Sequence, residues 1–179
     1  MENLFSTSQR IKILQEVIYR AERISVNNTA SQLKVSKGLV SKYFQILLRH
    51  KILKKEKGKL VVSDSPLVKA IKIMLNIKGI DVRIFRRYPF VTAAGLYGSC
   101  ARGENTENSD IDLWIRLMDV EETEVAPLTS EIGKKIRNAK VLFLSDTKLE
   151  KIREEDTMFY HSLAFGSIVL YGDMDAAHI

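Results

Sequence analysis

The sequence is poor in the residues that build disulfide frameworks and zinc sites. Its 179 residues include one cysteine, Cys100, and three scattered histidines, His50, His161 and His178. A single cysteine excludes an internal disulfide and is typical of a reducing compartment, and the histidine spacing matches no zinc motif. We therefore interpret Cys100 as a small buried thiol and expect a cytoplasmic protein.

Long apolar segments and low-complexity linkers are also lacking. No apolar run approaches the roughly 20 residues that cross a bilayer, and the N-terminus has no signal-peptide segment. Hydrophobic residues nevertheless make up 45% of the chain, which is enough for a packed core. We expect two small domains or one ordinary domain, with no membrane partner.

Acidic residues are scarce in the first third of the chain. Residues 1–63 contain 13 Lys and Arg but only 4 Glu, a net charge of +9. Residues 64–179 contain 15 Lys and Arg and 18 Asp and Glu, a net charge of −3. This uneven distribution indicates two modules, of which only the first attracts a polyanion.

A Gly-Ser turn and two aspartates form the most informative segment. Gly98-Ser99 follows a run, residues 90–97, that reads as a buried strand. Polar and apolar residues then alternate strictly over residues 110–117, so Asp110 and Asp112 lie on one face of a strand. Mg²⁺ would relieve the repulsion between these two carboxylates. A turn of small residues at a helix start suits a phosphate, so the segment predicts a metal and phosphate site.

The spacing of these residues resembles a known signature. Gly98-Ser99, ten residues, Asp110, one residue and Asp112 resemble the nucleotidyltransferase superfamily related to DNA polymerase beta. The fuller string, Gly-Ser-x-Ala-Arg-Gly followed by Ser-Asp-Ile-Asp-Leu, resembles its minimal nucleotidyltransferase branch. The resemblance covers about 90 residues, from Tyr88 to the C-terminus. It implies a small α/β domain with a mixed sheet that transfers a nucleoside monophosphate from ATP or another triphosphate to an acceptor.

The same resemblance implies roles for individual residues. Asp110 and Asp112 would be the catalytic residues and would hold Mg²⁺ in a two-metal site, while Gly98 and Ser99 would hold the terminal phosphates. Arg102 would lie near those phosphates or pair with a neighbouring acid. Trp114 shares the carboxylate face, where it would stack a base or, as is commoner, pack beneath a helix.

A third carboxylate is missing where the resemblance places one. Family members often have it on a later strand, as a metal ligand or as the base for the attacking hydroxyl. The equivalent strand here, residues 139–144, contains no acid, and we interpret Asp146 after it as a helix cap. This predicts weak catalysis while leaving nucleotide and metal binding in place.

Residues 1–63 contain the string Ala30-x-x-Leu33-x-Val35-Ser36-x-Gly38-x-Val40-Ser41, which resembles the turn and recognition helix of winged helix-turn-helix domains. Apolar stripes predict helices over residues 9–22 and 24–33, and Ser36 is suited to cap a third helix. A basic hairpin with Gly58 in its turn follows. By the resemblance, the third helix would enter the major groove of double-stranded DNA and the hairpin would grip phosphates. The residues expected to contact DNA are Lys37, Ser41, Lys42, Gln45, Lys54, Lys55, Lys57 and Lys59. The alternative is a solvated lysine-rich hairpin on a domain that docks proteins.

The predicted organisation is an α+β chain of three parts. A winged helix-turn-helix domain occupies residues 1–63, a connecting helix residues 64–87, and the nucleotidyltransferase domain residues 88–179. Pro66 suits the first turn of the connecting helix. Residues 167–171 resemble the strand with which such domains often close, and no acceptor-binding domain follows it. We therefore expect a partner protein or a second copy, as in a homodimer, to complete the site.

Two functions from different classes fit these features. The preferred function is a nucleotidyltransferase joined to a DNA-binding module. Minimal nucleotidyltransferases resemble the antitoxin halves of toxin–antitoxin pairs, which suggests a helical toxin-like protein as the acceptor. The alternative is a transcriptional regulator whose catalytically weak nucleotidyltransferase-like domain senses nucleotide or dimerises.

Overall fold

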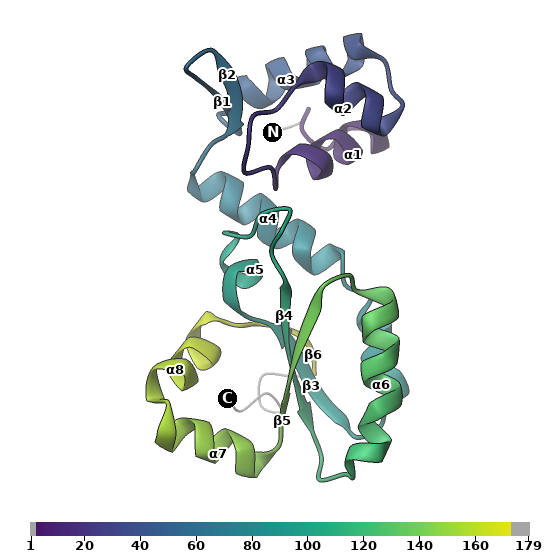
Figure 1. The fold of residues 1–179 in the computed structure, drawn as a ribbon, viewed down its shortest axis with the longest axis vertical. Coiled ribbons are helices and arrows are strands. Elements are labelled where there is room, and N and C mark those ends of the chain that lie inside the picture. Colours follow the sequence, from purple (N-terminus) through teal and green to yellow (C-terminus); the bar gives the residue numbers. More distant parts are fainter. Residues whose placement is uncertain (1–2, 173–179) are drawn as a thin grey trace. The chain divides into compact units, whose positions relative to one another are not determined.

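The computed structural model describes residues 3–172, which form two compact units (Figure 1). The first unit extends to Lys72 and includes Thr106–Asn108, and the second comprises Ile73–Asn105 and the chain from Ser109 onward. Residues 1–2 and 173–179, the outer ends of the predicted first and last domains, lie outside the described residues. Within residues 3–172, no helix combines the length and the apolar character that a bilayer crossing requires.

Three helices and a two-stranded hairpin dominate the first unit. They are α1 (Ser8–Val17), α2 (Val26–Leu33), α3 (Lys37–Arg49), β1 (Leu53–Glu56) and β2 (Lys59–Val62), with the two strands antiparallel. Ser36 caps α3, because its hydroxyl accepts a hydrogen bond from the Leu39 backbone N–H at 3.2 Å. The predicted cap of α3 and the predicted hairpin are both present.

The core of the first unit comes from the apolar stripes of α1 and α3. Seven of their side chains are no more than 1% exposed: Ile13, Leu14, Val17, Val40, Tyr43, Phe44 and Leu47. The buried Tyr43 hydroxyl donates a hydrogen bond to the Leu4 carbonyl at 2.8 Å, which satisfies the polar end of the ring. Burying one face of α3 leaves its opposite face for solvent.

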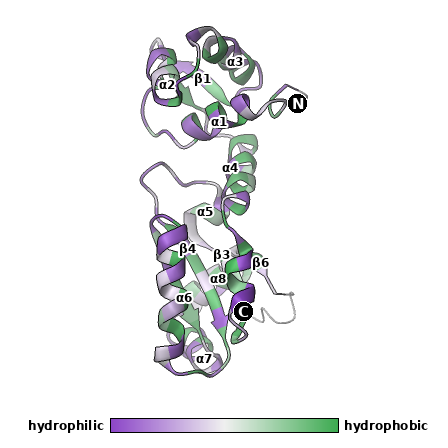
Figure 2. Ribbon diagram, turned by 90° about the vertical axis from the view of Figure 1, so that its right-hand side faces the viewer, coloured by the Kyte–Doolittle hydropathy of each residue, from purple (hydrophilic) through white to green (hydrophobic). Residues whose placement is uncertain are grey.

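The single connecting helix predicted over residues 64–87 is instead two helices. The largely hydrophobic α4 (Pro66–Lys78) is drawn mostly in green in Figure 2, and the 3₁₀ helix η1 (Val82–Arg87) follows it. The break falls at Gly79, a weak helix former. The Asp81 carboxylate then accepts a hydrogen bond from the Arg83 backbone N–H and starts η1. The prediction of one continuous helix was therefore wrong.

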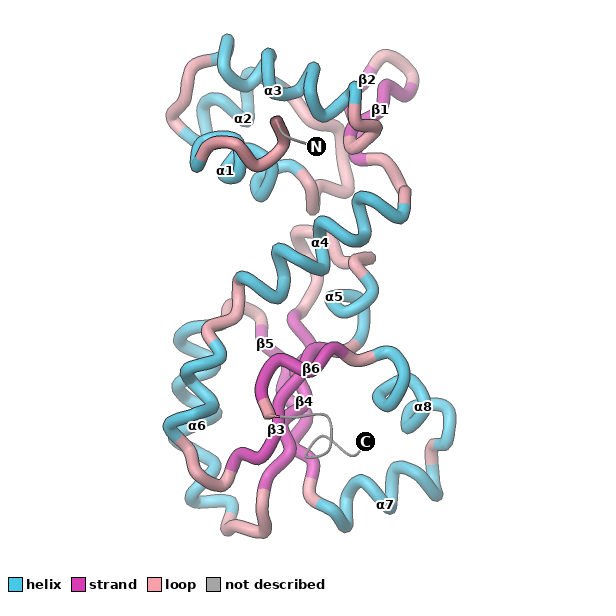
Figure 3. Tube along the Cα trace, turned by 180° about the vertical axis from the view of Figure 1, so that it is seen from behind, coloured by secondary structure: helices cyan, strands magenta, loops and turns pink. Residues whose placement is uncertain are grey.

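A mixed four-stranded sheet forms the centre of the second unit. Its elements after η1 are β3 (Val91–Leu96), α5 (Gly98–Arg102), β4 (Ile111–Leu117), α6 (Glu122–Lys135), β5 (Ala139–Leu144), α7 (Asp146–Glu155), α8 (Thr157–Gly166) and β6 (Ile168–Tyr171). The strand order is β5-β4-β3-β6, with β5 parallel to β4 and the other neighbours antiparallel. In Figure 3 the sheet lies between α6 and the α7–α8 pair. The predicted α+β class and mixed sheet are confirmed.

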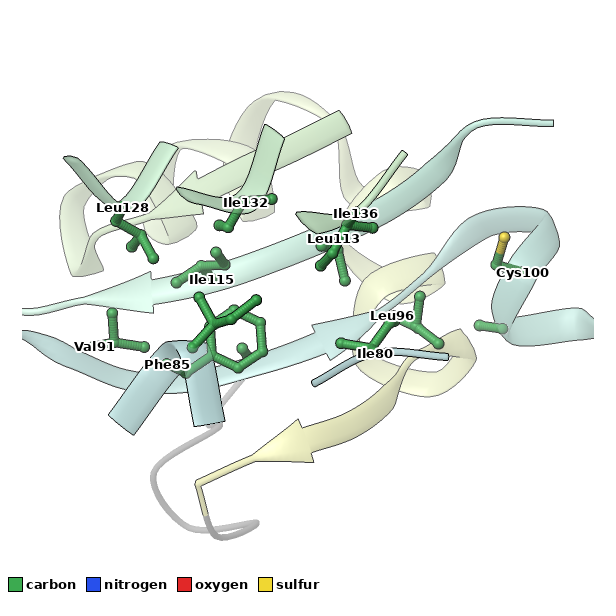
Figure 4. Close-up of a cluster of buried hydrophobic side chains, with 13 residues drawn as sticks. Ile80, Phe85, Val91, Leu96, Cys100, Leu113, Ile115, Leu128, Ile132 and Ile136 are labelled. Carbon is green, nitrogen blue, oxygen red and sulfur yellow. The ribbon is translucent and has the colours of Figure 1, made fainter. Parts of the chain in front are cut away.

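Alternate residues of β4 face two different cores. Leu113 and Ile115 pack against apolar side chains of α6 and η1, as Figure 4 shows for Leu128, Ile132 and Phe85. Trp114 points to the opposite face, where it packs with Leu144, Leu149 and Leu163 of β5, α7 and α8. Its side chain is fully buried. The indole therefore packs beneath helices, and neither face of its ring is free to stack against a nucleotide base.

Gly95 makes room for Trp114, its register partner on β4. A Cβ at Gly95 would lie 2.5 Å from two indole carbons and 2.6 Å from the Ile168 carbonyl oxygen. We expect Gly95→Ala to lower the free energy of unfolding by about 1–3 kcal/mol, because neither the buried ring nor the backbone carbonyl of the sheet can move away from the added methyl group. Urea unfolding followed by tryptophan fluorescence measures this loss.

Gly133 of α6 provides the matched control, since a Cβ there meets nothing within 4 Å. Gly133→Ala is expected to leave stability unchanged or to raise it by up to about 1 kcal/mol, because alanine is the better helix former. Equal unfolding midpoints for the two alanine variants would contradict the close packing inferred at Gly95.

Candidate active site

The Gly-Ser turn starts α5 directly after β3, and it lies against the second aspartate. Gly98 has a φ of 66°, a left-handed conformation that favours glycine. A Cβ at this position would lie 2.5 Å from Oδ2 of Asp112. The Tyr97 backbone N–H donates to the Asp112 carbonyl oxygen at 3.1 Å, which ties the turn to β4. The fold therefore brings together the two halves of the predicted motif.

The two aspartates lie at the start of β4, on the face that also carries Trp114. Asp110 immediately precedes the strand and its side chain is 41% exposed, whereas Asp112 is the second strand residue and is half-buried. Burial raises the pKa of the Asp112 carboxyl, and the negative charge of Asp110 adds to the rise. The positive charges of Lys140 and Arg102 oppose it. The site thus concentrates negative charge in a partly desolvated place.

Lys140 faces these carboxylates from the neighbouring strand. It is the register partner of Asp112 in the parallel β4–β5 pair, so the two side chains share a face of the sheet. Its Nζ lies 2.6 Å from Oδ2 of Asp110, and this hydrogen bond raises the pKa of the Lys140 ammonium. Sequence reasoning placed no site residue here. The available signal was a lone charged side chain within an otherwise apolar strand.

Arg102, the remaining residue predicted to bind nucleotide, pairs with a neighbouring acid. Its Nε donates to Oε2 of Glu104 at 2.9 Å. Of the two roles left open by the sequence, the structure contains this salt bridge. The Ser99 carbonyl accepts hydrogen bonds from the backbone N–H groups of Gly103 and Glu104, which closes the short helix α5.

Two asparagines form hydrogen bonds that hold α5 in place, and no sequence pattern indicated this role for them. The Asn76 side-chain amide donates to the Cys100 carbonyl oxygen at 2.8 Å and to Oδ1 of Asn105 at 3.1 Å. Asn105, only 7% exposed, donates back to Oδ1 of Asn76 at 3.2 Å. The reciprocal pair joins the last turn of α4 to the segment that carries the Gly-Ser turn.

Asp146 lies elsewhere, beyond the end of β5, and it is not the cap of α7. The N-cap is Ser145, whose hydroxyl accepts a hydrogen bond from the Lys148 backbone N–H at 3.2 Å. Asp146 instead occupies the first turn of α7, where the helix dipole favours an acid, and its Oδ1 pairs with Nη2 of Arg116 at 2.7 Å. The prediction of Asp146 as a helix cap was therefore wrong.

The donor set suits a hard cation that brings ligands of its own. Across residues 3–172, no group of three or more His, Cys, Asp and Glu side chains is placed to hold a metal ion. Asp110 and Asp112 supply carboxylate oxygens, and the bare Cα of Gly98 leaves space beside Asp112. Mg²⁺ commonly binds through one or two carboxylates and completes its shell with phosphate oxygens and water. These residues fit such an ion.

The Cys100 thiol is 1% exposed, as predicted for a buried cysteine, and burial raises its pKa to about 11. Because only the thiolate reacts readily, we expect alkylation by iodoacetamide at pH 8 to be about 100-fold slower in the folded protein than in urea. Burial slows it further by blocking access. Mass spectrometry of timed samples measures the two rates, and rapid labelling of the folded chain would contradict the burial of this thiol.

The eight residues predicted to contact DNA are all exposed. Lys37, Ser41, Lys42 and Gln45 lie on α3, and Lys54, Lys55, Lys57 and Lys59 belong to the hairpin. Lys54 Nζ lies 3.2 Å from Oε2 of Glu56, an exposed pair that water screens. The fold of the first unit thus leaves every one of these side chains accessible to a polyanion.

Comparison with known proteins identifies the second unit. The family model for polymerase beta nucleotidyltransferases matches residues 82–174, more than half of the chain. No curated protein matches the chain.

Three solved structures illustrate a more distant likeness. A toxin–antitoxin complex with AMP-PNP is 19% identical, with 57% of this chain and 77% of that chain covered and a TM-score of 0.41. A structure of the tri-AMPylated Shewanella oneidensis HEPN toxin in complex with MNT antitoxin contains a chain that is 17% identical, with 57% of this chain and 75% of that chain covered and a TM-score of 0.36. A putative nucleotidyltransferase from Sulfolobus solfataricus is 16% identical, with 58% and 83% covered and a TM-score of 0.37.

Proposed function

The chain belongs to the polymerase beta nucleotidyltransferase family, and on that premise we propose that its second unit transfers a nucleoside monophosphate from ATP or another triphosphate to an acceptor. One observation carries the proposal: a Cβ at Gly98 would lie 2.5 Å from the Asp112 carboxylate. The phosphate-binding turn and the metal-binding carboxylate are therefore in contact, and a metal–triphosphate complex can engage both.

Each residue of the site has a separate task in the proposed reaction. Asp110 and Asp112 hold Mg²⁺, and backbone N–H groups at Gly98 and Ser99 bind the terminal phosphates. When bound, Mg²⁺ neutralises phosphate charge and stabilises the charge that develops during transfer. An acceptor hydroxyl attacks the α-phosphorus in line, and the bond to the bridging oxygen breaks. Pyrophosphate leaves with the electron pair, and the hydroxyl proton passes to water.

Turnover by the isolated chain is expected to be slow, because β5 carries Lys140 rather than a carboxylate beside Asp112. A positioned base typically contributes ~10²–10⁴-fold in rate, so its absence weakens catalysis without abolishing it. The test is incubation with Mg²⁺ and ATP labelled on the α-phosphate, with and without cell lysate. We expect a labelled acceptor, such as a partner protein, only with lysate, and none in EDTA. Rapid pyrophosphate release without any acceptor would contradict this expectation.

For the first unit we propose a winged helix-turn-helix role in which residues 1–63 bind double-stranded DNA. The net charge of +9 over this segment and the exposure of its eight predicted contact residues support the proposal. Lysines on the hairpin would contact phosphates, while Ser41, Lys42 and Gln45 on α3 would face base edges. A protein-docking role for the same surface is the alternative, and a DNA titration separates the two.

The position of Lys140 also favours a second candidate, a transcriptional regulator whose nucleotidyltransferase domain binds nucleotide without efficient transfer. Such a protein would change its DNA affinity or its oligomeric state when ATP and Mg²⁺ are added. Fluorescence anisotropy and sedimentation with and without the nucleotide measure both properties. An unchanged DNA affinity and mass, together with transfer of label to an acceptor, would favour the enzyme.

A further inference from the structure

Lys140 lies beside both aspartates of the site, and the proposed chemistry gives it no role. Parallel register places it beside Asp112, and its Nζ lies 2.6 Å from Oδ2 of Asp110. The two apolar residues that follow on the same face, Leu142 and Leu144, pack against the core around Trp114. The ammonium group therefore lies near the start of β5, beyond the edge of this core, and faces the two carboxylates.

Stability of the fold does not account for this ion pair. The Lys140 side chain is 68% exposed and that of Asp110 is 41% exposed. Exposed ion pairs contribute little to stability, and lysine is disfavoured in strands relative to β-branched and aromatic residues. What the pair does change is the charge of the site, because a fixed positive charge already lies against one of the two metal-binding carboxylates.

We propose that the Lys140 ammonium takes the place of a second metal cation, so that the site binds a single divalent ion together with the triphosphate. The proposal rests on the proposed nucleotidyltransferase function and replaces the two-metal site expected from the family resemblance. Two-metal sites hold their ions about 3.5–4 Å apart. A second divalent ion on Asp110 would lie at a similar distance from the ammonium, which repels it. Among the described residues, no third carboxylate joins Asp110 and Asp112 to hold such an ion.

Mn²⁺ is paramagnetic and replaces Mg²⁺ at oxygen sites, so it allows the divalent ions bound to the site to be counted directly. Electron paramagnetic resonance of free Mn²⁺, with one equivalent of a non-hydrolysable ATP analogue per chain, gives the number of ions bound per complex. We expect one Mn²⁺ in the wild-type protein and two in Lys140→Asp, with spin coupling between the two ions. Two ions in the wild type, or one ion in a folded Lys140→Asp, would overturn the proposal.

A titration with Mn²⁺ alone keeps this test independent of nucleotide binding. Removing the ammonium should strengthen Mn²⁺ binding roughly 10-fold in Lys140→Ala, and further in Lys140→Asp. A positive group this close to a carboxylate lowers the affinity of that carboxylate for a proton about 10-fold or more, and it should lower the affinity for Mn²⁺ similarly. Lys134→Asp on α6, an equal charge change at an exposed site on the other face, should leave the affinity unchanged.

The two experiments distinguish a failure of the proposed nucleotidyltransferase function from a failure of the role proposed for Lys140. If the ATP analogue binds to no variant, the proposed function fails, while the Mn²⁺ titration still decides the role of Lys140. If Lys140→Asp does not fold, as judged by circular dichroism, Lys140→Ala still provides the comparison of Mn²⁺ affinity. Equal Mn²⁺ affinities for the wild type and Lys140→Ala would overturn the proposal.

Discussion

Asp112→Asn is expected to abolish Mg²⁺-dependent binding of a nucleoside triphosphate. The carboxylate is one of two negative groups on its strand face and lies against Gly98 of the Gly-Ser turn. Loss of a residue that only hydrogen-bonds to a metal-binding side chain typically lowers metal affinity about 10–100-fold. Loss of a side chain that binds the metal directly should therefore lower the affinity about 100-fold or more. Calorimetric titration with a non-hydrolysable ATP analogue, in Mg²⁺ and in EDTA, measures the effect.

The fold itself should tolerate this change, which makes the result interpretable. Burial raises the pKa of Asp112, so the folded state disfavours the charged carboxylate above that pKa. A neutral amide of the same shape removes the cost, and the thermal midpoint without ligand should stay the same or rise. Asp119→Asn, an exposed acid in the loop after β4, is the matched control and should bind the analogue normally. Wild-type affinity in Asp112→Asn would show that the site lies elsewhere.

Replacing Lys54, Lys55, Lys57 and Lys59 by glutamine is expected to cause the largest loss of DNA affinity. All four side chains are exposed on the hairpin. Removing one lysine–phosphate interaction should lower the slope of log K against log salt by about 0.9 unit, so the four substitutions together should lower it by roughly 3–4 units. Because phosphates carry no sequence information, binding to all DNA sequences should weaken alike. Fluorescence anisotropy at several salt concentrations gives the slope.

A matched control removes the same charge from the second unit, by replacing its exposed residues Lys134, Arg137, Lys148 and Lys151 with glutamine. This variant should keep most of the wild-type affinity and slope. Changes at Ser41, Lys42 or Gln45 should instead alter which sequence is preferred. If both quadruple variants bound DNA equally well, the hairpin would be a protein-docking element and would not contact DNA.

Local sequence patterns predicted most of the second unit because its strands alternate cleanly. The alternation over residues 110–117 placed the two aspartates and Trp114 on one face and Leu113 and Ile115 on the other, and the structure has the same division. The helix break at Gly79 was missed because the apolar stripe of α4 resumes at Ile84. Periodicity alone does not distinguish one long helix from two short ones.

The Lys140 ion pair lay beyond such reasoning for a different reason. It depends on the register between two parallel strands that are separated in the chain by α6. A shift of one residue would turn Lys140 to the opposite face, and nothing local in either strand fixes that register. The Asn76–Asn105 pair was missed similarly, since an asparagine near a helix end and another in a loop carry no sign that they meet.

That asparagine pair determines where the second unit can be cut from the chain. The family match begins at residue 82, six residues after Asn76. A fragment trimmed to the match would keep every residue of the signature, yet it would lose the amide that holds the Cys100 carbonyl and the side chain of Asn105. The boundary of sequence similarity is thus not the boundary of the folding unit. A fragment that carries the second unit should begin ahead of α4, at about residue 64, with all of that helix included.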